Sequence, residues 1–223
     1  MVNQKNYSNK KLTQWSFNKK VAQNFDKIAE KNIPRYQAVI DKCLLITKKT
    51  FPGDLNIKII DIGSATGRTL DIFIKSGFKN VYGVENSKHM INMSKHKERV
   101  IFSDNFPRDM SDYFDVVTAN WTLHFIKRRK QYIKDIYSSL KKGGFFVLTE
   151  KISTSSFIHN RYHDFKRKQG LTEKEILDKE ISLKGVLTTK PLSWYLNTLK
   201  EVGFSEVEII DTDWCFVSIL CRK

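Results

Sequence analysis

The chain has 223 residues, of which 40% are hydrophobic and 28% charged, and its formal net charge is +15. The apolar fraction excludes a disordered chain, and only 10 glycines and 4 prolines exclude a fibrous one. No apolar run approaches the roughly 20 residues that span a bilayer, and 3 scattered cysteines exclude a disulfide framework. We therefore expect one cytoplasmic domain over residues 1–223, with no signal peptide and no membrane contact.

The basic excess is compatible with a polyanion such as RNA, because the release of counterions favours such binding. Only residues 127–130 form a dense basic run, however, and the other basic residues alternate with acidic ones. A lysine-rich, solvated surface is therefore favoured over a nucleic-acid partner.

The N-terminal part of the chain has helical patterns over residues 18–30 and 35–50, so we expect residues 1–52 to form a helical cap. Residues 53–151 alternate between short apolar strands and helices. We expect strands at 56–62, 80–85, 100–102, 114–119 and 145–149, and helices at 68–76, 87–95 and 127–141, the last ended by Gly143 and Gly144. This alternation is typical of a doubly wound α/β fold, whose mostly parallel sheet is covered on both faces.

The C-terminal part differs in pattern. Residues 152–190 indicate a polar helical insert, and residues 191–202 a further helix. Residues 204–211 and 215–221 then predict two strands with a tight connection, which would form the antiparallel end of a seven-stranded sheet. Trp194 and Trp214 are expected to be core aromatics.

A glycine-containing turn, DIGSATG over residues 61–67, lies where the first predicted strand of the sheet passes into a helix. Glu85 ends the next strand, 24 positions after Asp61. In doubly wound sheets such a turn, here with Gly63 and Gly67, lets the backbone approach a nucleotide, and an acid at this distance accepts hydrogen bonds from the ribose. Two glycines leave the pyrophosphate fingerprint incomplete, and the chain has no phosphate-binding GxxxxGK[ST] loop, so a nucleoside without phosphates, such as S-adenosylmethionine, fits better.

Polar residues also follow the third and fourth predicted strands. Asp104 and Asn105 follow the third, where a carboxylate could accept the adenine amino group, and Asn120 follows the fourth, beside the expected position of the sulfonium. Loop capping by Asp104 and a satisfied turn amide at Asn120 are the structural alternatives.

The chain resembles class I S-adenosylmethionine-dependent methyltransferases, and among them the carboxy-S-adenosyl-L-methionine synthases, from Trp15 to the C-terminus. The resemblance is carried by WSF (15–17), IPRY (33–36), DIGSATG, ENS (85–87), NWTL (120–123), LTEK (148–151) and HDFKR (163–167). It implies a Rossmann-like fold, S-adenosylmethionine as cofactor, a small-molecule substrate and a homodimer. The cofactor contacts that it implies come from Tyr36, Gly63, Ser64, Ala65, Glu85, Asn86, Asp104 and Asn120.

The resemblance also implies a reaction, in which a carboxyl group released from prephenate is placed on the sulfonium methyl group. An arginine of the family pairs with that carboxylate, and Glu180 occupies its position here, which reverses the charge. We therefore expect diverged chemistry, most simply group transfer to a small molecule. One alternative is carboxy-S-adenosylmethionine synthesis for wobble-uridine modification in transfer RNA, with Lys179 or Lys184 restoring the positive charge. A second is cyclisation or lysis of S-adenosylmethionine that releases methylthioadenosine. A third is a non-enzymatic role in binding S-adenosylmethionine or RNA.

The candidate catalytic residues are Asn120, Tyr162 and Glu180. His124 could act as a general base, although a partly exposed loop histidine is the favoured interpretation. His159 and His163 have the i, i+4 spacing of metal ligands, but no third ligand is evident, so no metal is expected.

Overall fold

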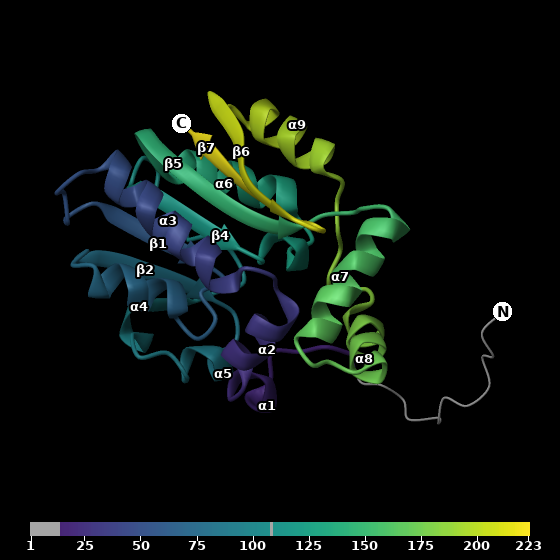
Figure 1. Cartoon of the computed structure of the whole chain (residues 1–223). Coiled ribbons are helices and arrows are strands. Elements are labelled where there is room, and N and C mark those ends of the chain that lie inside the picture. Colours follow the sequence, from purple (N-terminus) through teal and green to yellow (C-terminus); the bar gives the residue numbers. More distant parts are fainter. Residues whose placement is uncertain (1–13, 108) are drawn as a thin grey trace.

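The computed structural model describes residues 14–107 and 109–223, and within them a single sheet of seven strands forms the centre of the molecule (Figure 1). The strand order is β3-β2-β1-β4-β5-β7-β6. The strands are β1 (Lys58–Ile62), β2 (Asn80–Glu85), β3 (Val100–Phe102), β4 (Phe114–Asn120), β5 (Leu140–Lys151), β6 (Glu206–Asp213) and β7 (Phe216–Arg222).

The sheet is parallel except for β7, which pairs antiparallel with both β5 and β6. The strand order reverses at β1, because β2 pairs with one edge of β1 and β4 pairs with the other. A doubly wound sheet binds its ligand at such a reversal, beyond the carboxyl ends of the strands. The predicted fold class and the antiparallel C-terminal end of the sheet are therefore confirmed.

Helices cover both faces of the sheet because residues alternate in direction along each strand. Ile59 packs with α3 and α4 on one face, and its neighbour Ile60 packs with α6 and α9 on the other. The helices are α1 (Lys19–Ala22), α2 (Phe25–Asn32), α3 (Tyr36–Thr50), α4 (Arg68–Lys75), α5 (Lys88–Ile91), α6 (Arg129–Ser139), α7 (Ser156–Lys168), α8 (Glu173–Leu183) and α9 (Leu192–Val202), with 3₁₀ turns at Lys97–Arg99 and Leu123–Phe125.

Three expectations for these elements were wrong. Helix α6 ends at Ser139, and Gly143 and Gly144 lie inside β5, where the pairing with β4 shifts register. A side chain at Gly144 would lie 2.9 Å from the carbonyl oxygen of Asp115, so the glycine allows the strands to stay close. Helix α5 ends at Ile91 rather than near residue 95, and Trp214 is 45% exposed in the turn between β6 and β7 rather than in the core.

Helices α7 and α8 form the predicted insert between β5 and the C-terminal strands, and they lie near α1 and α2 at one end of the sheet (Figure 1). The backbone N–H of Trp15 donates to the carbonyl of Ser182 at 2.8 Å, so the N-terminal segment and α8 are in contact. The first 13 residues of the expected cap lie outside the described part of the chain.

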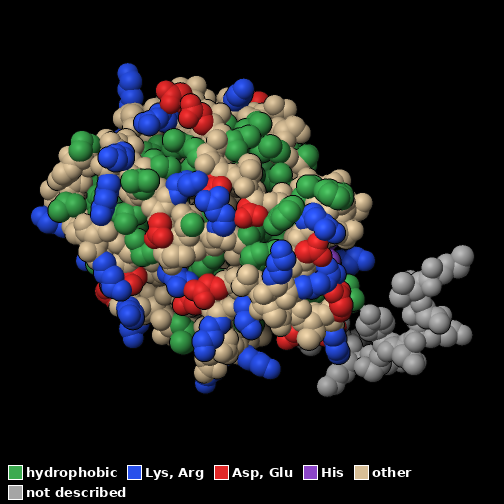
Figure 2. All heavy atoms as spheres, viewed as in Figure 1, with side chains coloured by type: hydrophobic (Ala, Val, Ile, Leu, Met, Phe, Trp, Pro, Cys, Tyr) green, Lys and Arg blue, Asp and Glu red, His purple; other side chains and the backbone are tan. Residues whose placement is uncertain are grey.

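The surface carries the basic excess in dispersed form. Lysine and arginine side chains on the face in Figure 2 are spread among acidic and apolar ones, as the sequence predicted. No helix in the described ranges has both the length and the apolar character needed to cross a bilayer.

Candidate functional site

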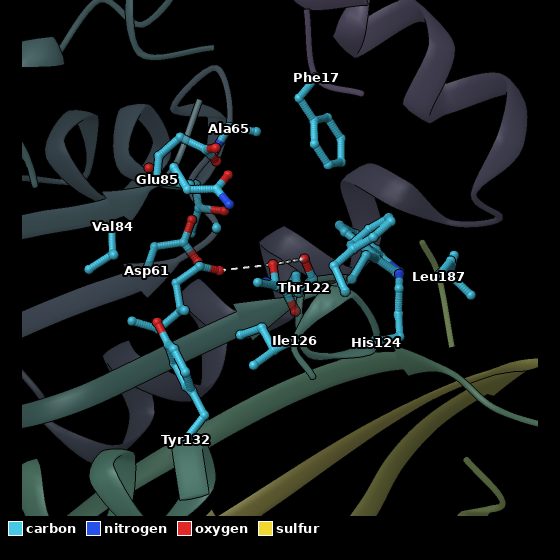
Figure 3. A pocket seen from close by; sticks show the side chains of 18 of the residues that line it. Phe17, Asp61, Ala65, Val84, Glu85, Thr122, His124, Ile126, Tyr132 and Leu187 are labelled. Atoms are coloured by element: carbon cyan, nitrogen blue, oxygen red, sulfur yellow. Dashed lines mark hydrogen bonds between the residues drawn. The ribbon is translucent and has the colours of Figure 1, made fainter. Parts of the chain in front are cut away.

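A cavity of about 1290 Å³ lies beyond the carboxyl ends of the parallel strands, between the sheet and helices α2, α3, α7 and α8. Of the predicted site residues, Tyr36, Gly63, Ser64, Ala65, Glu85, Asn86, Asp104, Asn105, Asn120, Tyr162 and Glu180 line it, and Gly67 does not. Figure 3 shows Asp61, Ala65 and Glu85 together on one side of the cavity, and Thr122 and His124 on another.

The glycine turn is fixed by contacts within the protein. Gly63 and Gly67 have φ of +68° and +83°, a region that side chains disfavour. A side chain at Gly63 would lie 2.2 Å from Oγ1 of Thr122, and one at Gly67 would lie 2.3 Å from Oγ of Ser94. Gly67 therefore serves packing rather than the cavity wall, whereas Gly63 lets the loop after β4 close against the turn.

Glu85 ends β2 and orients the surrounding backbone. Its Oε2 accepts a hydrogen bond from the N–H of Ala65 at 2.9 Å, and its Oε1 accepts one from the N–H of Ser87 at 2.8 Å. Burial raises the pKa of Glu85, and these backbone hydrogen bonds oppose that shift. A carboxylate accepts about four hydrogen bonds, so about two remain for hydroxyl groups of a ligand.

Asp61 is a cavity residue that the sequence reasoning did not select. It lies near the end of β1 with 4% of its surface exposed, and its Oδ1 accepts a hydrogen bond from Oγ1 of Thr118 at 2.5 Å. Burial raises its pKa to about 7, against the effect of the Thr118 hydrogen bond. Its position directly before the glycine turn was a usable signal, because a buried acid beside a cavity suits a cationic ligand.

Three buried polar atoms at the cavity have no hydrogen-bond partner within the described residues: Oγ of Ser64, Oδ1 of Asn120 and Nε1 of Trp121. The amide nitrogen of Asn120 donates to Sγ of Cys43 at 3.7 Å. The Tyr36 ring packs on that of Trp121 with centroids 4.7 Å apart. Unpartnered buried groups are costly, so they indicate that a polar ligand completes this part of the site.

Asn86, Asp104 and Asn105 lie at the open side of the cavity. Asn86 follows β2, and the other two follow β3, where Ser103 donates its N–H to the carbonyl of Glu85. All three are exposed and line the cavity, so they are accessible to a ligand.

His124 differs from the favoured interpretation, because it is only 3% exposed. Its Nδ1 lies 2.9 Å from Oε2 of Glu150, which also accepts a hydrogen bond from the Tyr195 hydroxyl at 3.0 Å. Oε1 of Glu150 accepts the N–H of Leu123 at 2.8 Å. This buried network holds the loop after β4. No local sequence pattern indicates it, because its members come from three distant segments.

The opposite end of the cavity is basic. Lys151 from β5, Lys166 from α7 and Lys179 from α8 line it, and Lys166 is 2% exposed. Burial, together with the smaller effect of a neighbouring lysine, lowers the pKa of Lys166 and of Lys179 to about 8. Lys184 is exposed and lies outside the cavity wall, so of the two lysines considered from the sequence only Lys179 reaches the cavity.

Tyr162 lies within this basic end. Its ring lies 4.6 Å from Nζ of Lys151 and 4.4 Å from Nζ of Lys166, and its hydroxyl donates to the carbonyl of Asn32 at 2.7 Å. Tyr162 therefore holds α7 against α2 and lines the cavity with its ring.

Glu180 lines the cavity but faces two histidines of α7. Its Oε1 lies 2.9 Å from Nε2 of His159 and 2.6 Å from Nε2 of His163. Burial would raise the pKa of Glu180, but the hydrogen bond and charge of His163 and the charge of Lys166 outweigh it and lower that pKa. Glu180 is thus surrounded by positive or hydrogen-bond-donating groups.

Comparisons with known proteins agree with this architecture. Residues 25–177 match the family model described as a methyltransferase domain. A carboxy-S-adenosyl-L-methionine synthase of Nautilia profundicola is 34% identical over 88% of this chain and 89% of that protein. A solved structure of a putative S-adenosylmethionine-dependent methyltransferase from Methanococcus maripaludis is 23% identical, with a TM-score of 0.61 over 98% of this chain and 97% of the other. A phosphoethanolamine N-methyltransferase of Haemonchus contortus, solved with S-adenosylhomocysteine, is 19% identical, with a TM-score of 0.58 over 86% of this chain and 43% of the other.

Proposed function

Because the chain belongs to the methyltransferase-domain family and is an S-adenosylmethionine-dependent enzyme, we propose that it catalyses a reaction between S-adenosylmethionine and a small anionic molecule. Its relatives include carboxy-S-adenosyl-L-methionine synthases. The observation that carries this proposal is that buried carboxylates at the ends of β1 and β2 and a set of lysines from β5, α7 and α8 line one cavity. Asp61 and Glu85 belong to the acidic end, and Lys151, Lys166 and Lys179 form the basic end, which we call the lysine cluster.

The acidic end fits S-adenosylmethionine. Glu85 keeps hydrogen-bonding capacity for the ribose hydroxyls, and Asp61 provides a buried carboxylate for the cationic amino acid part. The unpartnered polar atoms of Ser64 and Asn120 supply further hydrogen bonds. When bound, the cofactor supplies an activated carbon next to its sulfonium.

The lysine cluster fits the second substrate. Three ammonium groups that face one cavity repel one another. Burial is the main cause of the lowered pKa of Lys166 and Lys179, and this repulsion adds to it. A carboxylate bound among them relieves the repulsion and gains charge-assisted hydrogen bonds. The protein then holds a cation at one end and an anion at the other, and such positioning of two reactants can supply a large part of a rate enhancement.

Carboxyl transfer is the first reaction to test. The related synthases supply the precedent. His159 and His163 lie within hydrogen-bond distance of Glu180 here, so the replacement of the family's arginine does not leave an acid without partners. The lysine cluster supplies the positive charge that the arginine position lacks.

The experiment is incubation of the purified protein with S-adenosylmethionine, with and without prephenate, followed by mass spectrometry of the cofactor. A carboxylated cofactor supports synthase chemistry. S-adenosylhomocysteine that forms only when prephenate is present supports transfer of the methyl group to that compound. Methylthioadenosine formed without a second substrate would replace the proposal with cyclisation or lysis. Absence of binding heat on titration with S-adenosylmethionine would contradict it altogether.

A further inference from the structure

Helices α7 and α8 bring three potential metal ligands together behind the lysine cluster. His159 and His163 lie one turn apart on α7, with ring centroids 4.6 Å apart, and Glu180 reaches them from α8. The donor atoms of the three residues all lie within 4.8 Å of one another. The sequence suggested no metal because no third ligand was evident, and the docking of α8 on α7 supplies that ligand.

We propose that His159, His163 and Glu180 form a binding site for a divalent transition-metal ion of the Zn²⁺ class. Two imidazole nitrogens and one carboxylate oxygen are the protein ligands of many open zinc sites, which keep a fourth position free. An i, i+4 pair of histidines on one helix face is the usual framework for such a site.

The two contacts between the histidines and Glu180 require little rearrangement. Nε2 of His159 and of His163 lie 2.9 Å and 2.6 Å from Oε1 of Glu180. Metal bonds of about 2.0–2.2 Å in a tetrahedral arrangement place ligand atoms roughly 3.3 Å apart, so each histidine nitrogen needs to move away from Oε1 of Glu180 by less than about 1 Å. All donor atoms already lie within 4.8 Å of one another. His163 and Glu180 are only 11% and 29% exposed and lie on helices, which limits the alternatives open to their side chains.

The surrounding charges act on this site in two ways. Lys151 and Lys166 lie close enough to influence His159 and Glu180, and their charges oppose a bound cation. The same lysines favour an anion as the fourth ligand of that cation. A divalent ion held by one carboxylate and two neutral imidazoles has a local charge of 2 − 1 = +1, so it would turn the position of Glu180 into a positive centre at the cavity wall.

That consequence for the substrate rests on the proposed function, whereas the metal site itself does not. Metal binding is therefore measured on the untagged full-length protein without cofactor or substrate. Isothermal titration with Zn²⁺ should show one site per chain, and Co²⁺ in its place should give the absorption bands of a low-symmetry, nitrogen- and oxygen-ligated ion.

Three variants assign the ligands. His163→Ala, His159→Ala and Glu180→Gln should each abolish the Co²⁺ bands and weaken Zn²⁺ binding by at least about 100-fold, because loss of an outer-shell partner alone costs up to about 100-fold. His89→Ala, which changes an exposed histidine on α5, should leave both unchanged. Circular dichroism shows whether each variant is folded. A folded wild-type protein that binds no stoichiometric Zn²⁺, or a His163→Ala variant with wild-type affinity, overturns the proposal, and neither result depends on whether the protein reacts S-adenosylmethionine.

Discussion

The two ends of the cavity are built in different ways. The acidic end consists of strand ends and tight turns, so its geometry is set by backbone hydrogen bonds such as those from Ala65 and Ser87 to Glu85. The basic end consists of side chains on β5, α7 and α8, and it exists only because the helical insert packs over the end of the sheet. One end of the site is therefore fixed by the fold itself, whereas the other end can change by substitution of single side chains.

The largest effect is a loss of stability at Gly63, where the acidic end has no space for an added side chain. Gly63→Ala introduces a side chain 2.2 Å from Oγ1 of Thr122 at a φ of +68°, so we expect the free energy of unfolding to fall by roughly 3 kcal/mol. Gly53→Ala is the matched control, because Gly53 has a φ of +77° but no atom within 4 Å of the added carbon. It should cost about 1 kcal/mol by denaturant unfolding. Equal losses in the two variants would show that the turn tolerates a side chain.

The second effect concerns the ribose contact. Glu85→Gln keeps the shape of the side chain but removes its charge and replaces one acceptor oxygen with a donor. We expect S-adenosylmethionine to bind roughly 30-fold more weakly by calorimetry, because hydrogen bonds to a charged group contribute about 1.5–3 kcal/mol. Glu98→Gln, at an exposed position, should bind normally. If the Glu85 variant bound S-adenosylmethionine with unchanged affinity, the nucleoside could not be assigned to this end of the cavity.

The third effect is a pH dependence that arises at Asp61. Burial raises its pKa to about 7, so its carboxyl group is increasingly protonated below pH 7 and no longer attracts a cationic ligand. The affinity for S-adenosylmethionine should therefore fall as the pH decreases from 7 to 6, by at most about tenfold over that pH unit. Asp61→Asn should abolish this dependence. Calorimetry in buffers of different ionisation enthalpy should detect a proton released on binding at pH 6.5.

The same shift has the opposite consequence for the ligand-free protein. Between pH 3.8 and about 7 the folded state holds the Asp61 proton more tightly than the unfolded state does, so the contribution of this group to stability falls as the pH rises through that range. Thermal unfolding of wild type and Asp61→Asn should diverge over this range, and parallel curves would exclude a raised pKa.

The smallest effect is expected at the basic end, where three lysines share one task. Lys166→Met should raise KM for the anionic substrate about fivefold with little change in S-adenosylmethionine affinity. Because the pKa of Lys166 is about 8, the wild-type KM should also rise as the pH increases above 8. Lys168→Met, an exposed position on the same helix, is the control. If Lys166→Met weakened only the binding of S-adenosylmethionine, the assignment of the cofactor and the anionic substrate to the two ends would be contradicted.

The same contrast determines what could be predicted from the sequence. Strands β2 and β3, the glycine turn and the position of Glu85 were predicted correctly because apolar runs, glycines and a terminal acid are local signals. Burial of Lys166 and the pairing of Glu180 with His163 were not predictable, because they depend on the docking of two helices across the cavity. The Glu150–His124 contact likewise joins residues 26 positions apart.

The two ends of the cavity are joined by the chain's own N-terminal segment. Oγ of Ser87, beside Glu85, donates to the carbonyl of Phe17 at 2.6 Å, while the N–H of Trp15 donates to Ser182 on α8 and the Trp15 ring lies 3.8 Å from Nζ of Lys179. Trp15 and Phe17 also line the cavity. Anchoring of this segment and occupancy of the cavity are therefore thermodynamically linked. If the anchored segment increases the affinity for a ligand by some factor, the bound ligand must shift the anchoring equilibrium by the same factor and so protect the segment from proteases.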